Sequence, residues 1–330
     1  MAYRFKLNEP IRNGFLRIGV EQIDRAERQL IQSRDHDRSI HETRKCLKRV
    51  RALLRLVRPG LEDKDYRHSN GLFRQIGAQL SEARDNQIML QTITRLETQG
   101  MRAPLQGLKR LLLEERNCGT SGIDPGLTAA AVAGLGQARQ HFETLKVSQS
   151  SFKTLRRGLE RSYGHGRRAS AIAFSEPSDE AFHELRKGAQ RHWRHMKLLA
   201  PAWPEFCEAR VAAARELSQI LGDDHDLAVL KMFLKRVRTE EIGPAEARVI
   251  RRAIRERQNE LREAARPRAK RLFAERAKDF GRHLESLWSS AQHIREEDRG
   301  EQNDTRSQKD KTSRATAGPN SPVAAARPIR

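Results

Sequence analysis

Apolar residues recur three and four positions apart along most of the chain between residues 9 and 290. This spacing places them on one face of a helix. Runs of alternating β-branched residues, which would indicate strands, are few. In the first such segment the apolar face is formed by Ile11, Phe15, Ile18, Ile23, Ala26 and Leu30. The pattern therefore predicts an all-α fold.

Proline and glycine divide this pattern into separate helices. We expect breaks at Pro59-Gly60, Gly100, 119–126, Gly164 to Gly166, Pro177, Pro201 to Pro204 and Gly243-Pro244. The first helix begins after Pro10, and the others are predicted at about 39–58, 62–98, 103–117, 126–146, 149–164, 178–200, 204–239 and 243–289.

The composition changes after Trp288. Residues 289–330 hold no Leu, Phe, Trp or Tyr, and charged and small polar residues dominate. Such a segment cannot bury enough apolar surface to fold, so we predict a disordered polar tail after a helical domain over residues 1–288. Three cysteines far apart, no apolar leader and no apolar run of membrane-spanning length favour a cytoplasmic protein.

An internal repeat is the most informative feature of the sequence. The segment from His41 to Lys45, HETRK, returns 142 positions later as HELRK from His183 to Lys187. A second segment, from Leu80 to Asp85, returns as Leu221 to Asp226 at a spacing of 141. Two matches at nearly equal spacing predict two homologous helical halves, about 9–120 and 126–288, packed as pseudo-symmetric antiparallel bundles.

The chain is strongly basic, with 64 Lys+Arg against 43 Asp+Glu and a net charge of +21. Nearly all of this excess lies in the helical body, since residues 289–330 hold eight Lys+Arg and six Asp+Glu. Such a charge favours a polyanionic partner: nucleic acid, an anionic membrane or a chain of phosphates.

Positive charge is concentrated on the helix that carries the first copy of the repeat. At helical spacing, one face of this helix holds what we call the first cationic stripe: His41, Arg44, Lys48, Arg51 and Arg55. Lys45 and Arg49 flank it. The stripe is about 21 Å long at 1.5 Å per residue, enough to follow several phosphates. Like charges so closely spaced destabilise an isolated helix, so we expect an anion to compensate them.

The second copy keeps part of this pattern. The corresponding positions are His183, Arg186, Gln190, Trp193 and Lys197, while Lys187, Arg191 and Arg194 form an adjacent line. His192 and His195 add protonatable groups. Because the cations recur along with the apolar pattern, we expect both helices to face one cavity or groove.

A further basic cluster lies at residues 153–168. It contains Lys153, Arg156, Arg157, Arg161, Tyr163, His165, Arg167 and Arg168. Gly164 and Gly166 are predicted to break the helix there, leaving backbone N–H groups and two arginines as an anion nest. A plain charged helix end is the alternative.

No cofactor, metal site or catalytic nucleophile is predicted. His41-Glu42 and His183-Glu184 begin like a zinc-peptidase motif, but Lys45 and Lys187 occupy the place of its second histidine. The acids from Asp223 to Asp226 could hold Mg²⁺ with a phosphate, yet they are more often helix caps and dipole partners. We expect Asp85 and Asp226 to orient neighbouring arginines.

These features together resemble the CHAD family, the conserved histidine α-helical domain. The matching features are the doubled HExRK segment with its further cations, the paired segments at residues 80 and 221, the RSYGHGRR sequence from Arg161 to Arg168, and a last helix ending at Trp288. The resemblance implies two pseudo-symmetric bundles around a basic groove that binds inorganic polyphosphate, and an association with polyphosphate granules. The residues it assigns to phosphate are His41, Arg44, Lys45, Lys48, Arg49, Arg51, His183, Arg186, Lys187, Arg191 and Arg194.

The leading interpretation is a non-enzymatic polyphosphate-binding protein, to which Arg55, Lys197, Arg157, Arg161, Arg167 and Arg168 also contribute. Histidines with a pKa near 6.5 would strengthen its binding in mild acid. The first alternative is a nucleic-acid or nucleoid binder, although aromatic residues are only 5% of the chain. The second is a metal-dependent polyphosphate or triphosphate hydrolase that uses the acids at 82–85 and 223–226.

Overall fold

The protein is represented by a computed structural model, which describes residues 3–33, 35–80, 85–98, 106–118, 125–148, 151–237 and 242–316. Within these ranges the chain forms helices and no strand. The predicted all-α fold is confirmed.

A first bundle holds the helices α1 (Ile11–Gln32), α2 (His36–Val57), α3 (Asp63–Gln79) and α6 (Pro125–Thr144). A 3₁₀ turn, η1 (Arg58–Gly60), joins α2 to α3. The four helices pack around fully buried aromatic rings, with the ring centroid of Phe142 4.6 Å from that of Phe15 and 6.4 Å from that of Phe73. The apolar face predicted for the first helix is the face that this core buries.

A second bundle holds α7 (Phe152–Ser175), α8 (Asp179–Leu198), α9 (Pro204–Arg236), the end of α11 (Pro244–Leu272) and the start of α12 (Ala277–Thr316). The turn η3 (Ala200–Ala202) connects α8 to α9. Tyr163 lies at its centre, where its ring stacks on Phe280 and its hydroxyl donates to the carbonyl of Leu272 at 3.1 Å.

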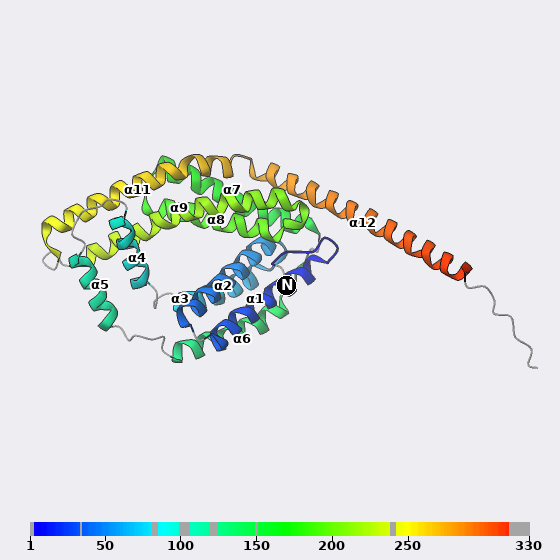
Figure 1. The fold of residues 1–330 in the computed structure, drawn as a ribbon, viewed down its shortest axis with the longest axis horizontal. Coiled ribbons are helices and arrows are strands. Elements are labelled where there is room, and N and C mark those ends of the chain that lie inside the picture. Colours follow the sequence, from blue (N-terminus) through cyan, green and yellow to red (C-terminus); the bar gives the residue numbers. More distant parts are fainter. Residues whose placement is uncertain are drawn as a thin grey trace, which may run out of the picture.

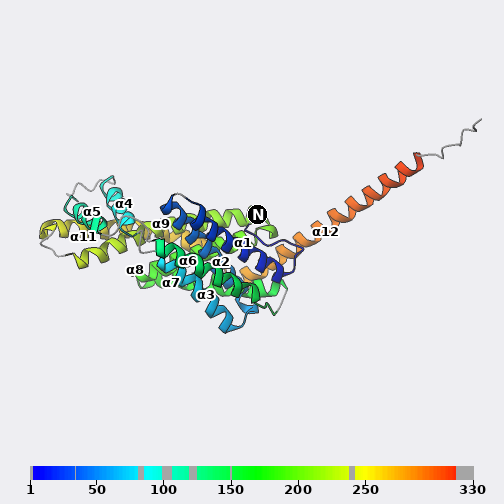
Figure 2. The same cartoon turned by 90° about the horizontal axis from the view of Figure 1, so that it is seen from below.

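A helical arm extends away from both bundles (Figures 1 and 2). It consists of α4 (Asp85–Thr98), α5 (Gln106–Cys118), the end of α9 and the start of α11. Ile93 and Leu108 pack there with Leu230, Phe233 and Ile250 in a second apolar core. The chain of the first half therefore contributes α4 and α5 to a unit completed by α9 and α11.

The two bundles meet where α2 packs against α7 and α8. The α2–α7 contact depends on Gly158, because a Cβ atom at this position would overlap the carbonyl oxygen of Leu56. The repeated HExRK segments lie on α2 and α8, and so the repeat places two related helices face to face.

The predicted break at Gly164 to Gly166 is wrong, and with it the predicted anion nest. Helix α7 continues to Ser175. Gly166 serves close packing instead: an added Cβ would lie 2.5 Å from the ring of Phe273, and one at Gly188 of α8 would lie 2.9 Å from the Cα of Gly166. Conversely, the predicted helices 62–98 and 243–289 are each divided in two, with α3 ending at Gln79 and α11 at Leu272.

Helix α12 continues beyond the packed core. Trp288 is buried, and the side-chain amide of Gln292 donates to the carbonyl of Leu7 at 2.7 Å, but the helix runs on to Thr316 and projects from the body (Figure 1). Residues 289–316, predicted as part of a disordered tail, are thus helical, in keeping with their many Glu, Gln, Arg and Lys residues. Residues 317–330 lie outside the described ranges.

None of the helices in the described ranges combines the length and the apolar character needed to cross a membrane.

Candidate functional site

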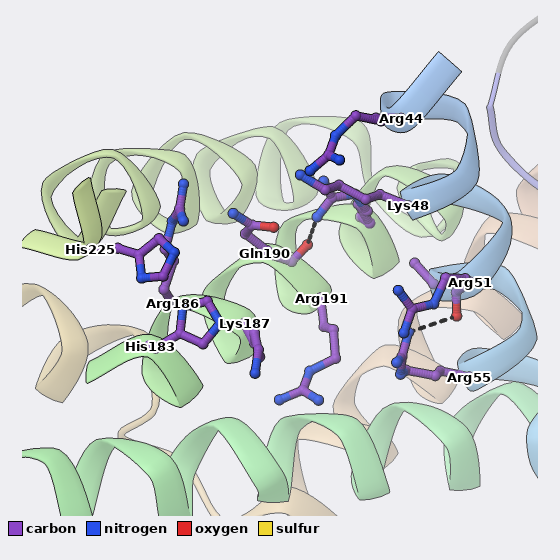
Figure 3. A pocket seen from close by; sticks show the side chains of 12 residues that line it. Arg44, Lys48, Arg51, Arg55, His183, Arg186, Lys187, Gln190, Arg191 and His225 are labelled. Atoms are coloured by element: carbon purple, nitrogen blue, oxygen red, sulfur yellow. Dashed lines mark hydrogen bonds between the residues drawn. The ribbon is translucent and has the colours of Figure 1, made fainter. Parts of the chain in front are cut away.

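A cavity of about 320 Å³ lies between α2 and α8, and a residue of α9 borders it (Figure 3). Side chains from both copies of the repeat point into it. Its lining consists of Arg44, Lys48, Arg51, Ala52 and Arg55 from α2, of His183, Arg186, Lys187, Gln190, Arg191 and Arg194 from α8, and of His225 from α9. The expectation that the two basic helices share one cavity is therefore met.

The lining contains eight Lys and Arg side chains and no carboxylate. On α2, Arg44, Lys48, Arg51 and Arg55 share one face because a helix turns by 100° per residue. On α8 the face is rotated relative to the predicted stripe: Lys187, Arg191 and Arg194 line the cavity, and Trp193 and Lys197 do not.

Neutral acceptors orient several of these guanidinium groups. Arg44 donates to the carbonyl of Gly77 at 2.9 Å, Arg51 to the side-chain oxygen of Asn70 at 3.1 Å, and Arg194 to the carbonyl of Gln190 at 2.7 Å. Arg55 donates to the carbonyl of Arg51 at 3.2 Å. These neutral groups fix the directions of the side chains without adding a negative charge of their own.

Burial and mutual repulsion are visible in the pKa values of the arginines. The pKa of Arg51 falls to about 10, first because the side chain is buried and then because Arg55 lies nearby. Burial likewise lowers the pKa of Arg194 to about 10 and, together with Arg55, lowers that of Arg191. All remain protonated at neutral pH, so the cavity concentrates charge in a partly desolvated place.

Four ring or guanidinium nitrogens beside the cavity are buried without a hydrogen-bond partner in the described part of the chain. They are Nδ1 of His183 and the Nε atoms of Arg186, Arg191 and Arg194. Unsatisfied buried donors are rare in folded proteins. A bound polyanion, which offers only acceptors, would suit such a lining.

His183 and His225 stack on each other at one end of the cavity, with ring centroids 4.2 Å apart. Burial, then His183 and Arg186, lowers the pKa of His225 to about 4. Burial and Lys187 lower the pKa of His183 as well. The expectation that His183 has an ordinary pKa near 6.5 is therefore wrong, because burial, and after it the charge of Lys187, opposes its protonation.

The two other histidines of α8 are structural. His195 is fully buried, and its Nε2 lies 3.0 Å from the carbonyl oxygen of Ala52. Burial lowers its pKa to about 3 and lowers the pKa of His192 well below the usual value. Their expected role as protonatable groups is wrong, since both are enclosed by the helix packing.

The acids near residue 224 lie inside α9 and are not helix caps, contrary to that expectation. Asp224 is buried and accepts from Arg262 at 2.7 Å, whereas Asp223 accepts from Arg95 at 3.1 Å. Asp226 lies near Arg186, whose pKa it acts to raise. No group of three or more potential metal ligands occurs in the described ranges. The side chain of Asp85 lies outside them.

The remaining residues of the first copy lie off the cavity. Lys45 pairs with Glu42 at 2.6 Å, and the charge of His41 also acts on Glu42. Arg49 donates to Gln22 at 3.1 Å. Lys45 and Arg49 lie about 100° and 140° around the helix from Arg44, and so point toward other neighbours.

In the second copy, the ammonium group of Lys197 lies 5.5 Å from the ring centroid of Trp193, and the guanidinium of Arg194 lies 4.2 Å from the same ring. Trp193 therefore packs against cations at the edge of the cavity.

The basic cluster of α7 contributes four exposed arginines: Arg157, Arg161, Arg167 and Arg168. The pKa of His165 is lowered by burial, Arg168, Arg191 and Arg161, in that order, so this face of α7 lies beside the cavity wall.

His225 and Ala52 are lining residues that were not among the predicted site residues. His225 belongs to the second repeated segment, from Leu221 to Asp226. Nothing in the local sequence pattern shows that α9 places its ring in contact with that of His183. Ala52 lies on the same face of α2 as Lys48 and is small, which allows α8 to approach.

The sequence model of the CHAD domain matches residues 15–235. This chain belongs to the CHAD domain family. The fold is similar to the crystal structure of the CHAD domain from the plant Ricinus communis, with a TM-score of 0.52 and 15% sequence identity, over 82% of this chain and 94% of that one. Among curated proteins, no relative matches. The CHAD match ends near the end of α9, and α11 and α12 lie beyond it.

Proposed function

We propose that this CHAD protein binds inorganic polyphosphate in the cavity between α2 and α8, without catalysing a reaction on it. The observation that carries the proposal is the convergence of eight Lys and Arg side chains, from both copies of the repeat, on one cavity with no carboxylate in its lining. The CHAD family is associated with polyphosphate binding in general. The proposed ligand residues are those that line the cavity, with Arg157, Arg161 and Arg168 of α7 as a basic approach to it.

A phosphate chain suits this lining better than nucleic acid does. Single-stranded nucleic acids are usually held by aromatic rings on which bases stack. The cavity lining contains no Phe, Tyr or Trp, and its two histidine rings stack on each other. Arginine can contact two phosphate oxygens at once, and lysine adds a movable point charge.

The pairing of Asp223 and Asp224 with arginines supports binding over hydrolysis, because these carboxylates are engaged by Arg95 and Arg262. We further propose that the protein acts in the cytoplasm and is recruited to polyphosphate granules through the same cavity.

The test is a competition assay with labelled long-chain polyphosphate at fixed salt. Tripolyphosphate, single-stranded RNA and duplex DNA compete at matched phosphate concentration. The site variant is Lys48→Glu/Lys187→Glu, which reverses one exposed lining cation on each helix. The control is Arg252→Glu/Arg282→Glu, which changes the net charge equally at exposed positions paired with Glu256 and Asp279.

We expect the site variant to lose at least tenfold in affinity, about 1.4 kcal/mol, and the control to lose much less. Equal loss in the two variants, or equal competition by all polyanions, would reduce the binding to the general effect of the net charge of +21. Release of phosphate by the pure protein that requires a divalent metal would support the hydrolase alternative instead.

A further inference from the structure

A second basic cavity of about 240 Å³ lies between the end of α9 and the first half of α11. Buried Ile254 and Gln258 form part of its wall. Five cations line it, and no carboxylate does: Lys231, Lys235, Arg251, Arg255 and Arg262.

The spacing along α11 repeats that of the central cavity. On α2 the lining residues Arg44, Lys48, Arg51 and Arg55 follow one another at intervals of four, three and four residues. On α11 the lining residues Arg251, Arg255, Gln258 and Arg262 have the same intervals. In both places a second helix adds cations one turn apart, Lys231 and Lys235 in this case. The same helical spacing of lining residues thus occurs twice, on different helices, with Gln258 in place of one cation.

The charge at the outer end of this cavity is not that of an ordinary solvated helix face. Other cations of α11 have an acidic partner one turn away, in the pairs Arg252–Glu256, Arg257–Glu260 and Arg266–Glu263. Arg251, Arg255 and Lys235 have no acid three or four positions away on either side in the sequence. None of the three has an ion pair within the described ranges.

The inner end is held by an ion-pair network. Asp179 accepts from Lys231 at 2.9 Å and from Arg262 at 2.6 Å, and Arg262 also donates to buried Asp224 at 2.7 Å. Asp179 lies one helical turn before His183, which lines the central cavity. Asp179 therefore links two lining cations of this cavity to α8, the helix that also lines the central cavity.

We propose that the cavity between α9 and α11 is a second site for phosphate chains, in which Lys235, Arg251 and Arg255 contact the anion and Asp179 and Asp224 hold Lys231 and Arg262 in place. The choice of ligand rests on the proposed function of the central cavity, whereas the charge of this cavity does not. A short oligophosphate and a second segment of a long chain offer the same chemistry here.

The test is a calorimetric titration with tripolyphosphate, which is too short to be shared by distant sites, on four full-length proteins at fixed salt. They are the unmodified protein, the second-cavity variant Lys235→Glu/Arg255→Glu, the central variant Lys48→Glu/Lys187→Glu and the charge-matched control Arg252→Glu/Arg282→Glu. All the replaced side chains are exposed, and unchanged helix content and melting temperature check the fold. A neutral variant, Lys235→Gln/Arg255→Gln, tests the site without adding repulsion.

We expect two binding events in the unmodified protein and the control, and one in each of the other charge-reversed variants. The neutral variant should weaken one event by about tenfold and leave the other unchanged. If the second-cavity variant matches the control in number of sites and affinity, the inference is wrong. If the central variant keeps both binding events and the second-cavity variant loses one, the proposed function fails while the second site stands.

A parallel titration with long-chain polyphosphate distinguishes the two sources of the anion. If one chain occupies both cavities, the second-cavity variant binds the long chain more weakly than the control. If separate chains occupy them, the affinity at the central site is unchanged and only the number of bound chains falls.

Discussion

The imidazole Nε2 of His195 on α8 lies 3.0 Å from the carbonyl oxygen of Ala52 on α2. A carbonyl oxygen only accepts, so Nε2 carries the proton. The ring is neutral because burial lowers its pKa to about 3. Ala52 also lines the cavity, which means that this buried bond joins the two basic helices at the wall of the site. It holds together helices whose facing charges repel each other.

The burial of His195, which lowers its pKa, predicts how stability depends on pH. The pKa of His195 is about 3 in the folded protein, against 6.5 for an ordinary histidine, so the unfolded chain binds the extra proton between these values. The free energy of unfolding should therefore be highest above pH 6.5 and fall as the pH drops toward 3, by up to about 1.4 kcal/mol per pH unit for this group.

The measurement is urea unfolding between pH 7 and 4 for the unmodified protein and His195→Gln. Glutamine can still donate to Ala52 but does not titrate, so its stability should change less steeply with pH. His192 contributes in the same direction and remains in both proteins. Identical slopes for the two proteins would show that His195 is not the group responsible.

A second prediction concerns the stacked pair of His183 and His225. In the free protein burial, and after it the charged groups nearby, keep both pKa values low, that of His225 at about 4. A bound polyanion favours their charged forms, so binding takes up protons and affinity rises as the pH falls. Because the pKa values start low, we expect most of this rise below pH 6, with little change between pH 8 and 7.

Tripolyphosphate affinity measured from pH 8 to 5 tests this. The ligand itself titrates, so the comparison is with His183→Gln/His225→Gln, in which only the histidine contribution is lost. We expect a shallower rise in the variant. A rise of equal size in both proteins would assign the effect to the ligand alone.

A third prediction concerns the stabilisation that a bound polyanion gives. In Lys48→Glu/Lys187→Glu two carboxylates stand among the cations of the cavity, but Lys187 also loses its exposed ion pair with Glu184 at 2.6 Å. Because an exposed pair contributes only about 0.2–1 kcal/mol, we expect the stability of this variant to differ little from that of the unmodified protein when no ligand is present. Adding tripolyphosphate at about 100 times its Kd should stabilise the unmodified protein by about 2.7 kcal/mol and the variant much less.

Thermal unfolding with and without tripolyphosphate gives both numbers. Arg252→Glu/Arg282→Glu is again the control, and it should keep the full ligand-induced increase in Tm. An equal ligand-induced increase in Tm in the site variant and the control would show that these lysines do not hold the anion.

The sequence predicts the helices and the basic face of α2 well, because both depend on local spacing. Arg44, Lys48, Arg51 and Arg55 all line the cavity, as one face of one helix must. On α8 the lining face differs by part of a turn from the predicted stripe, since the side of α8 that faces α2 is set by tertiary packing. His225 lies at the site for the same reason.

The glycines and histidines show the same limit. The sequence predicts a helix break at Gly166, yet this glycine lies inside α7, where it allows the close approach of α8 and Phe273. The sequence predicts His195 to be a protonatable group, but burial lowers its pKa and makes it a neutral structural side chain. Local sequence gives the chemical type of a residue, whereas its neighbours in the fold decide which of its properties is used.

The last prediction concerns the contact that sets the two bundles against each other. A side chain at Gly158 of α7 would overlap the carbonyl oxygen of Leu56 on α2. Gly158→Ala must therefore push α7 away from α2, and overpacking of this kind costs about 1–3 kcal/mol. Gly71 on α3 is a matched control, because an added Cβ meets nothing within 4 Å there, and Gly71→Ala should stabilise the helix by about 0.5–1 kcal/mol. Urea unfolding of the two variants should give shifts of opposite sign, and a loss of tripolyphosphate affinity in Gly158→Ala alone would show that this contact also sets the width of the cavity. Equal stability of the two variants would mean that α7 and α2 do not approach each other this closely.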